Sequence, residues 1–117
     1  MKKILIVDDV RGAREVLIYS LNELGLTEIV AAGSGQEALE KFIVGEFALV
    51  ISDVEMPGMD GFTLARSILE QDPEQPIFLM SSELKYADTA QKNSIHFLAK
   101  GYGPMDLQRA IEDCLHS

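Results

Sequence analysis

The sequence predicts an α/β domain in which five parallel strands form a doubly wound sheet with helices on both faces. Short β-branched apolar runs alternate five times with stretches of helical spacing, an order typical of parallel sheets. The length of 117 residues suits one compact domain, and the 47% hydrophobic and 25% charged residues are ordinary globular values. We therefore expect a single domain over residues 1–117 with right-handed crossovers.

Three of the apolar runs are continuous, as expected of strands that are buried on both faces of a sheet. They cover residues 4–7, 48–51 and 77–80. Two weaker runs, at residues 29–32 and 95–99, are expected to form the edges of the sheet.

Four of the five expected helices carry an apolar stripe together with an end signal. Gly25 is a C-terminal cap for the first helix, and Ser34 begins a capping-box pattern for the second. Pro73 closes the third helix, and Pro104 suits the first position of the last. Residues 84–92 form the least convincing helix, because little besides alanine is available for its buried face.

The charge and cysteine content exclude several classes of partner. A net charge of -9 argues against binding to nucleic acid or to an anionic membrane, both of which favour a basic surface. The apolar runs are too short to cross a bilayer. The single cysteine, Cys114, rules out an internal disulfide and is expected to pack in the core. We expect a cytoplasmic protein without nucleic-acid or membrane partners.

Polar side chains gather at the carboxyl ends of the predicted strands, the edge at which open parallel sheets bind ligands. Crowded carboxylates raise one another's pKa values, and a hard divalent cation such as Mg²⁺ relieves that repulsion. A carboxylate can also act as the nucleophile in phosphoryl transfer, with a lysine and a hydroxyl group assisting. The residues placed there are Asp8, Asp9, Asp53, Ser81, Ser82 and Lys100.

Four segments carry a resemblance to a known family. They are residues 6–9 (IVDD), residues 53–61 (DVEMPGMDG, the pattern D-x-x-M-P-x-M-x-G), residues 80–82 (MSS) and residues 97–100 (FLAK). In this order, the chain resembles the receiver domain of two-component response regulators, in the manner of the single-domain chemotaxis regulators. The resemblance implies a flavodoxin-like (βα)5 fold with strand order 2-1-3-4-5.

The resemblance also implies a role for each polar residue. Asp53 is expected to accept the phosphoryl group, with Lys100 and Ser81 assisting. Mg²⁺ is the implied cofactor, bound by Asp8, Asp9, Asp53 and the backbone carbonyl of Glu55. The backbone of Val54, Glu55 and Ser82 is expected to hold the phosphate. Ser81 and Phe97 are the expected switch residues.

The implied function is that of a phosphorelay response regulator. A sensor histidine kinase or phosphotransfer protein donates the phosphoryl group from a phosphohistidine, and the modified domain switches conformation and binds a downstream protein. Such a domain is not an enzyme beyond catalysing its own phosphorylation and dephosphorylation. The alternative is a pseudo-receiver that binds proteins without phosphorylation.

Three departures from the family pattern bear on these expectations. Gly101 stands where the family usually has proline, so the loop is either trans and reshaped or strained. The fourth helical segment is about one turn short, and Asn93-Ser94 replaces a small Gly-Ala pair. Glu55 and Glu83 place negative charge near the expected phosphoryl site.

Simpler or different readings exist for the same residues. The Asp8-Asp9 pair and Ser81 can cap helices, Asp53 can be a turn residue, and Phe97 can be an ordinary core side chain. An aspartyl-phosphate phosphatase is a weaker alternative, because residues 53–55 match its D-x-D pattern only loosely and residues 1–117 include no cap-domain insert. A flavodoxin-like cofactor site is disfavoured, because two aspartates at the end of the first strand repel phosphate.

Overall fold

The computed structural model describes residues 2–116, and within them five strands alternate with five helices. None of these helices is both long and apolar enough to span a bilayer. Each element lies where the sequence predicts it, with small differences at the ends. The strands are β1 (Lys3–Val7), β2 (Ile29–Ala32), β3 (Phe47–Asp53), β4 (Ile77–Ser81) and β5 (His96–Ala99). The helices are α1 (Arg11–Glu23), α2 (Gly35–Lys41), α3 (Gly61–Gln71), α4 (Lys85–Lys92) and α5 (Pro104–Leu115).

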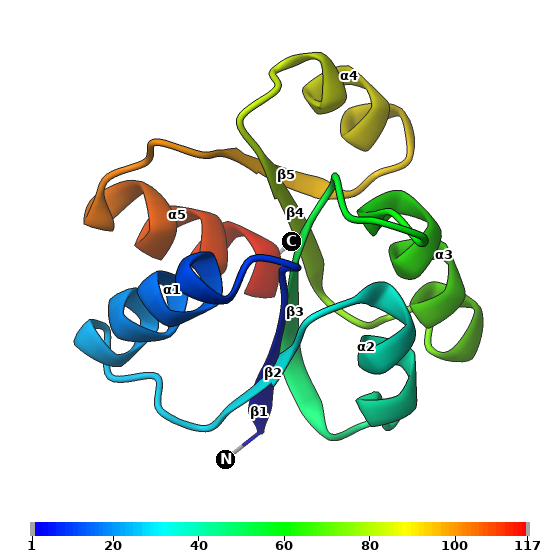
Figure 1. The fold of residues 1–117 in the computed structure, drawn as a ribbon, viewed down its shortest axis with the longest axis horizontal. Helices are drawn as coiled ribbons and strands as arrows, with labels where there is room; N and C mark the ends of the chain where they lie inside the picture. The colour runs from blue at the N-terminus through cyan, green and yellow to red at the C-terminus, as the bar shows by residue number, and fades with distance from the viewer. Residues whose placement is uncertain (1, 117) are drawn as a thin grey trace.

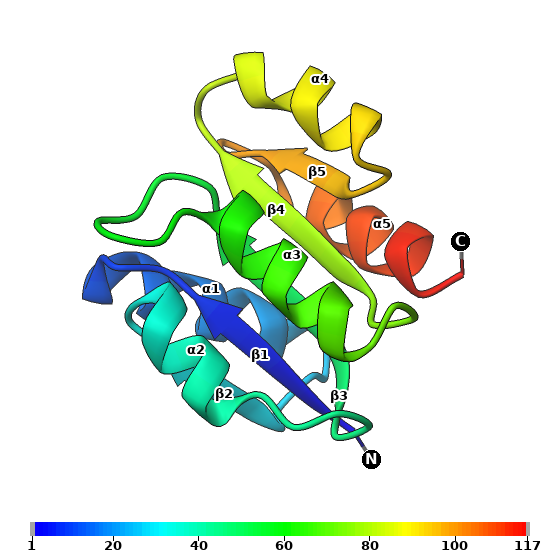
Figure 2. The ribbon, with the colours of Figure 1, turned by 90° about the vertical axis from the view of Figure 1, so that its right-hand side faces the viewer.

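The strands form one parallel sheet in the order β2-β1-β3-β4-β5, which confirms the predicted doubly wound topology. Helices α1 and α5 cover one face of the sheet, and α2, α3 and α4 cover the other (Figure 1). All strands run in the same direction, so their carboxyl ends share one edge (Figure 2). This edge is where the polar residues of the sequence are expected to meet.

The core consists of two layers, one on each side of the sheet. Successive residues of β1 alternate between them: Ile4 and Ile6 pack beneath α1 and α5, whereas Leu5 and Val7 pack beneath the other helices. Burial on both faces is the reason why the central strands read as continuous apolar runs. The edge strands β2 and β5 are mostly half-buried, as predicted from their weaker runs.

The predicted helix ends are largely confirmed by their hydrogen bonds. Gly25 follows α1 with φ +84° and donates to the Asn22 carbonyl. The Ser34 hydroxyl accepts from the N–H of Glu37 at 3.0 Å. The returning half of the capping box differs, because the Glu37 carboxylate accepts from the N–H of Gly33, at 2.7 Å, and not from that of Ser34.

Helix α4 is short, as the sequence suggests. It spans eight residues, against thirteen in α1 and twelve in α5. Its N-cap, Leu84, makes no side-chain capping bond, and Ala90 is its buried residue. Just beyond its end, Ser94 has φ +57°, a left-handed conformation that costs free energy for a residue with a Cβ atom.

Candidate functional site

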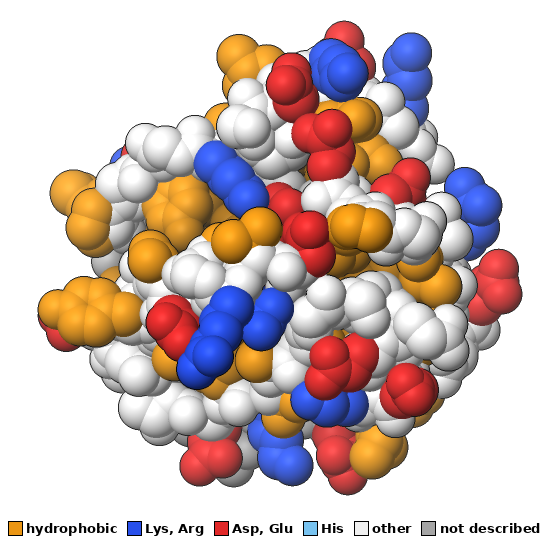
Figure 3. Space-filling view, viewed as in Figure 1, with side chains coloured by type: hydrophobic (Ala, Val, Ile, Leu, Met, Phe, Trp, Pro, Cys, Tyr) orange, Lys and Arg blue, Asp and Glu red, His pale blue; other side chains and the backbone are white. Residues whose placement is uncertain are grey.

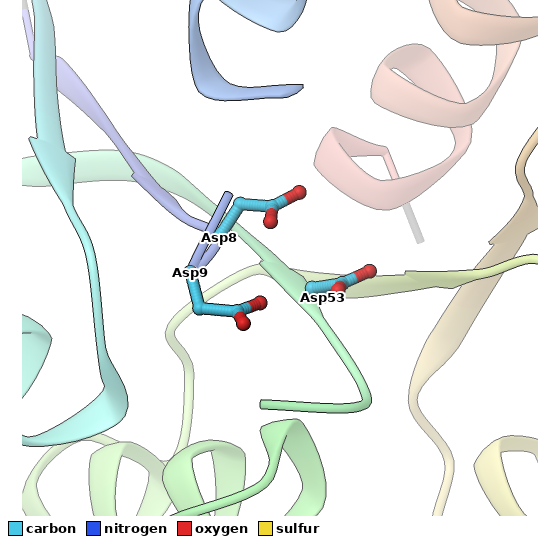
Figure 4. Close-up of side chains that lie close together, drawn as sticks. All are labelled: Asp8, Asp9 and Asp53. Atoms are coloured by element: carbon cyan, nitrogen blue, oxygen red, sulfur yellow. The ribbon is translucent and has the colours of Figure 1, made fainter. Parts of the chain in front are cut away.

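Three carboxylates meet at the carboxyl edge of the sheet, as predicted. Asp8 follows β1, and Asp53 is the last residue of the neighbouring strand β3, where Val7 pairs with Ser52. Carboxylate oxygens of Asp8, Asp9 and Asp53 all lie within 4.8 Å of one another. The three side chains project side by side from the ends of β1 and β3 (Figure 4). Acidic side chains accordingly lie near the centre of this face of the molecule (Figure 3).

Lys100 joins the cluster from the end of β5. Its Nζ lies 2.8 Å from Asp53 Oδ1 and 3.5 Å from Asp8 Oδ2. Among the described residues no peptide bond is cis, and the next residue, Gly101, has φ +91°. The loop is therefore trans and reshaped, which is the first of the two outcomes that the missing proline leaves open. Proline is itself unsuited to this position, because its ring fixes φ near −65°.

The charges of this cluster are unbalanced. Burial raises the pKa of Asp53; its hydrogen bond to Lys100 works in the opposite direction, and the charge of Asp8 adds to the rise. Burial favours the neutral form of Lys100, but its hydrogen bond to Asp53 and the charges of Asp53 and Asp8 outweigh burial and raise its pKa. Lys100 is therefore held as a cation. Its single positive charge is too small to balance the negative charges of three neighbouring carboxylates.

This donor set fits a hard divalent cation. Carboxylate oxygens are the ligands that Mg²⁺ prefers, and Mg²⁺ commonly uses one or two of them together with water and phosphate. A dication would offset the mutual repulsion that, with burial, raises the pKa of Asp53. Asp9 is exposed and Asp8 is buried, so the cluster opens toward solvent on one side.

The backbone around Asp53 is held by several short contacts. The Val54 N–H donates to the Met80 carbonyl at 2.9 Å, and the Gly61 N–H donates to the Val54 carbonyl at 2.8 Å. The buried Ser52 hydroxyl donates to the Asp53 carbonyl at 2.9 Å. A Cβ on Gly61 would lie well inside van der Waals contact with that carbonyl oxygen. Glycine at this position therefore lets α3 begin directly against the end of β3.

Not all three backbone groups expected to hold a phosphate are equally suited to do so. The Val54 N–H is already used by the sheet, because it donates to Met80 on β4. Glu55 and Ser82 lie in the loops that follow β3 and β4, and the side chains of both are exposed. We therefore retain the backbone of Glu55 and Ser82, and not the N–H of Val54, as candidates for binding phosphate.

The two expected switch residues have different surroundings. Ser81 is buried at the end of β4, and its hydroxyl oxygen accepts from the N–H of Glu83 at 2.9 Å. The bond pins the turn before α4 without making Ser81 the cap of that helix, and the hydroxyl proton can still be donated to another acceptor. Phe97 is half-buried and packs against the core layer beneath α2 and α3.

The helix-capping alternative for the aspartate pair is not supported. Helix α1 begins at Arg11, and its N-cap, Val10, makes no side-chain capping bond. Asp8 Oδ1 instead accepts from the Val10 N–H at 3.0 Å, which orients the carboxylate. The sequence reading missed Arg14, whose Nη1 donates to the Asp8 carbonyl at 2.8 Å. Arg14 lies one turn inside the helix that follows the acidic pair. A cation in that position is the sequence signal that would have suggested this contact.

Comparison with known proteins places these features in one family. A family model described as the response regulator receiver domain matches residues 4–112. The chemotaxis protein CheY of Pseudomonas aeruginosa is 31% identical over 115 residues, which cover 94% of this chain and 93% of that protein. The uncharacterized transcriptional regulatory protein YesN of Bacillus subtilis is 32% identical over 120 residues.

Solved structures give the same result. The response regulator protein TrrA of Thermotoga maritima, in complex with Mg²⁺-BeF, superposes with a TM-score of 0.88 at 34% identity, covering 98% of this chain and 100% of that one. A response regulator receiver domain protein of Clostridium thermocellum gives a TM-score of 0.89 at 27% identity, covering 98% and 94%. The chain spans 33% of the length of YesN and 17% of the length of the response regulator protein FleR of Pseudomonas aeruginosa.

Proposed function

This chain belongs to the response regulator receiver domain family, and from that premise we propose that Asp53 is its phosphoacceptor. The observation that carries the proposal is the contact of Asp53 with Lys100, at 2.8 Å, within a cluster of three carboxylates at the carboxyl edge of the sheet. A carboxylate held beside a fixed cation can act as a nucleophile toward a phosphoryl group. We propose that the unit which does so is the single domain of residues 1–117.

The reaction is transfer of a phosphoryl group from a phosphohistidine. A carboxylate oxygen of Asp53 forms the new bond to phosphorus, the P–N bond breaks, and the imidazole leaves with that electron pair and is protonated. Lys100 passes from its contact with Asp53 to the negative oxygens of the transferred group. Ser81 donates its hydroxyl proton to one of these oxygens, and the N–H groups of Glu55 and Ser82 bind others.

A bound Mg²⁺ would neutralise negative charge on the incoming phosphoryl group. Asp8, Asp9, Asp53 and the backbone carbonyl of Glu55 are the groups that would hold it. Asp8 is kept in place by the Val10 N–H and by Arg14, which donates to its carbonyl. The relative TrrA, which is 34% identical to this chain, was crystallised in complex with Mg²⁺-BeF. That complex supports the assignment.

Phosphorylation is proposed to shift the domain between two conformations. When the Ser81 hydroxyl turns toward the phosphoryl group, it loses its contact with the Glu83 N–H, which frees the turn before α4. Phe97 on the adjacent strand then moves inward. The short α4, with its single buried alanine, has little packing to resist such a shift. A downstream protein would then bind the altered surface.

The proposed donor is a sensor histidine kinase or a phosphotransfer protein, and the proposed location is the cytoplasm. The net charge of -9 supports the absence of nucleic-acid and membrane partners for this domain. We propose no catalytic activity other than phosphorylation and dephosphorylation of the domain itself. No observation on the described residues favours the pseudo-receiver alternative, since the acidic cluster and its lysine are intact.

Incubation with acetyl phosphate and Mg²⁺, followed by intact-mass measurement, tests the assignment. We expect a mass gain of one phosphoryl group in the wild type and none in Asp53→Asn. Asp60→Asn is the matched control, because Asp60 lies at the end of the loop that follows Asp53 and asparagine keeps its capping bond to Thr63. A gain that persists in Asp53→Asn, or a wild type that stays unmodified, would overturn the proposal.

A further inference from the structure

The connection between β5 and α5 has one large side chain between two glycines. Residues 101–103 read Gly-Tyr-Gly. Gly101 has φ +91°, and Gly103 caps α5 and donates its N–H to Asp106 Oδ2 at 3.0 Å. Because glycine restricts the backbone less than any other residue, Tyr102 is the residue of this segment whose side chain can restrain it by packing.

Tyr102 is anchored on the side of the molecule that faces α1 and α5. Its half-buried ring packs against the core layer that contains Leu17 and Leu107. With Tyr19, Leu24 and Leu107 it lines a hollow of about 450 Å³ between α1 and the start of α5. Hydrophobic side chains gather over α1 and the segment before α5 in the space-filling view (Figure 3).

The same ring also borders the phosphoacceptor site. Tyr102 shares with Lys100, Asp8 and Met80 the walls of a second hollow, of about 410 Å³. Burial raises the pKa of the Tyr102 hydroxyl, and the nearby charge of Lys100 works in the opposite direction. The ring thus lies between the hydrophobic surface of α1 and α5 on one side and the lysine on the other.

Lys100 itself has one backbone anchor at the end of β5, where its N–H donates to the Ser81 carbonyl at 2.9 Å. The chain beyond it turns through Gly101, which has no side chain to pack. A segment that is free on this side would let the Lys100 side chain sample positions away from Asp53. Tyr102 is the next residue that can hold the segment in place.

We propose that Tyr102 is a positioning residue, which packs on α1 and α5 and thereby holds Lys100 against Asp53. A rigid residue directly after the lysine could hold it in this way, but here that position is occupied by Gly101. Tyr102 takes over this role. The aromatic ring, and not the hydroxyl, carries the role. The proposal rests on the proposed function, because Lys100 is useful only if Asp53 receives a phosphoryl group.

The test compares three variants of the full chain. Tyr102→Ala removes the ring, and Tyr102→Phe removes only the hydroxyl. Leu24→Ala removes apolar packing from the hollow between α1 and α5, but Leu24 does not line the second hollow, to which Lys100 belongs. For each, the initial rate of phosphorylation by acetyl phosphate is measured at saturating Mg²⁺. Mg²⁺ affinity is measured by calorimetry, and hydrogen exchange of the Lys100 amide by NMR.

We expect Tyr102→Ala to be phosphorylated about ten-fold more slowly, since a small misplacement of a catalytic group is costly in phosphoryl transfer. Its Mg²⁺ affinity should stay within about two-fold of the wild type, and its Lys100 amide should exchange at least ten-fold faster. Tyr102→Phe and Leu24→Ala should match the wild type in all three measurements. A wild-type rate in Tyr102→Ala, or equal losses in Leu24→Ala, would overturn the proposal.

Hydrogen exchange separates this proposal from the proposed function. If the wild type takes up no phosphoryl group, the proposed function fails, and faster exchange at Lys100 in Tyr102→Ala alone still supports the anchoring role. If the wild type is phosphorylated but the Lys100 amide exchanges at the same rate in every variant, the anchoring role fails and the proposed function stands.

Discussion

At the scale of single residues, the backbone of Asp53 depends on a glycine eight positions further along the chain. Gly61→Ala would push a methyl group against the Asp53 carbonyl oxygen and the Val54 backbone. Because both neighbours belong to β3 or its direct extension, we expect the variant to lose about 2 kcal/mol of unfolding free energy. Its phosphorylation should also slow about ten-fold, since the carboxylate shifts with its backbone. Urea unfolding and the acetyl phosphate assay measure the two effects.

Gly12 provides the matched control for this prediction. It lies in α1, and a Cβ added there meets no atom within 4 Å. Gly12→Ala should therefore raise the unfolding free energy by about 0.5–1 kcal/mol, because alanine is the better helix former. If both alanine variants behave alike, the close approach at Gly61 is not what restricts that position.

Cys114 gives a pH dependence that arises far from the acidic cluster. Burial raises the pKa of its thiol to about 11, whereas a thiol in an unfolded chain ionises near pH 8.5. As the pH rises through this interval, the unfolded state loses the proton and the folded state keeps it, so the unfolding free energy falls. The stabilising contribution is complete below the lower pKa and is lost as the pH rises through the upper one.

The expected decrease is up to about 3 kcal/mol between pH 8 and pH 11. Urea unfolding of the wild type and of Cys114→Ala over this range measures it. The variant starts less stable, because it loses core packing, but its unfolding free energy should fall less steeply with pH. Parallel curves would show that the thiol does not titrate differently in the folded state. The same burial predicts that the thiol reacts with alkylating agents only when the chain unfolds.

At the scale of the elements, a strained residue lies just beyond the end of α4. Ser94 has φ +57° in the turn before β5, while its N–H still donates to the Gln91 carbonyl at 3.1 Å. Ser94→Gly should raise the unfolding free energy by about 1 kcal/mol, because glycine adopts this conformation without a Cβ clash. The midpoint of urea unfolding should rise with an unchanged slope. Ser94→Ala, which keeps the Cβ atom, should show no such gain.

The positions of the elements follow from features that are local in the sequence. A continuous apolar run such as residues 4–7 needs only burial on both faces to become a central strand. Gly25, Ser34 and Pro104 act through bonds or dihedral preferences of their immediate neighbours, and each stands at the helix end expected of it. The gathering of carboxylates was predictable for the same reason, since parallel strands end at a common edge.

Other features depend on contacts that no local pattern reveals. The Val54 N–H is used by β4 because of strand pairing, so its unsuitability for phosphate binding appears only in the folded chain. No sequence pattern distinguishes Tyr102, and only its place between two helices and Lys100 gives it the proposed role.

At the scale of the whole molecule, a net charge of -9 and a partly buried acidic cluster both oppose the compact state. Dilute salt screens the exposed charges, whereas the cluster is partly shielded from solvent and responds less. A specific dication would therefore stabilise the fold in a way that ionic strength alone does not. The distinction matters because any cation is attracted to so acidic a protein.

Mg²⁺ at ten times its dissociation constant should add about 1.4 kcal/mol to the unfolding free energy, because it binds the folded state and not the unfolded one. Urea unfolding with Mg²⁺, against NaCl at equal ionic strength, separates binding from screening. In Asp9→Asn the increment should largely disappear, since this exposed carboxylate is a proposed ligand whose loss leaves the core untouched. Glu15→Gln, which removes an exposed charge of α1 outside the cluster, should keep the full increment. If NaCl reproduces the effect, or if Asp9→Asn retains it, the stabilisation reflects the overall charge of the molecule and not a metal site at the end of β1.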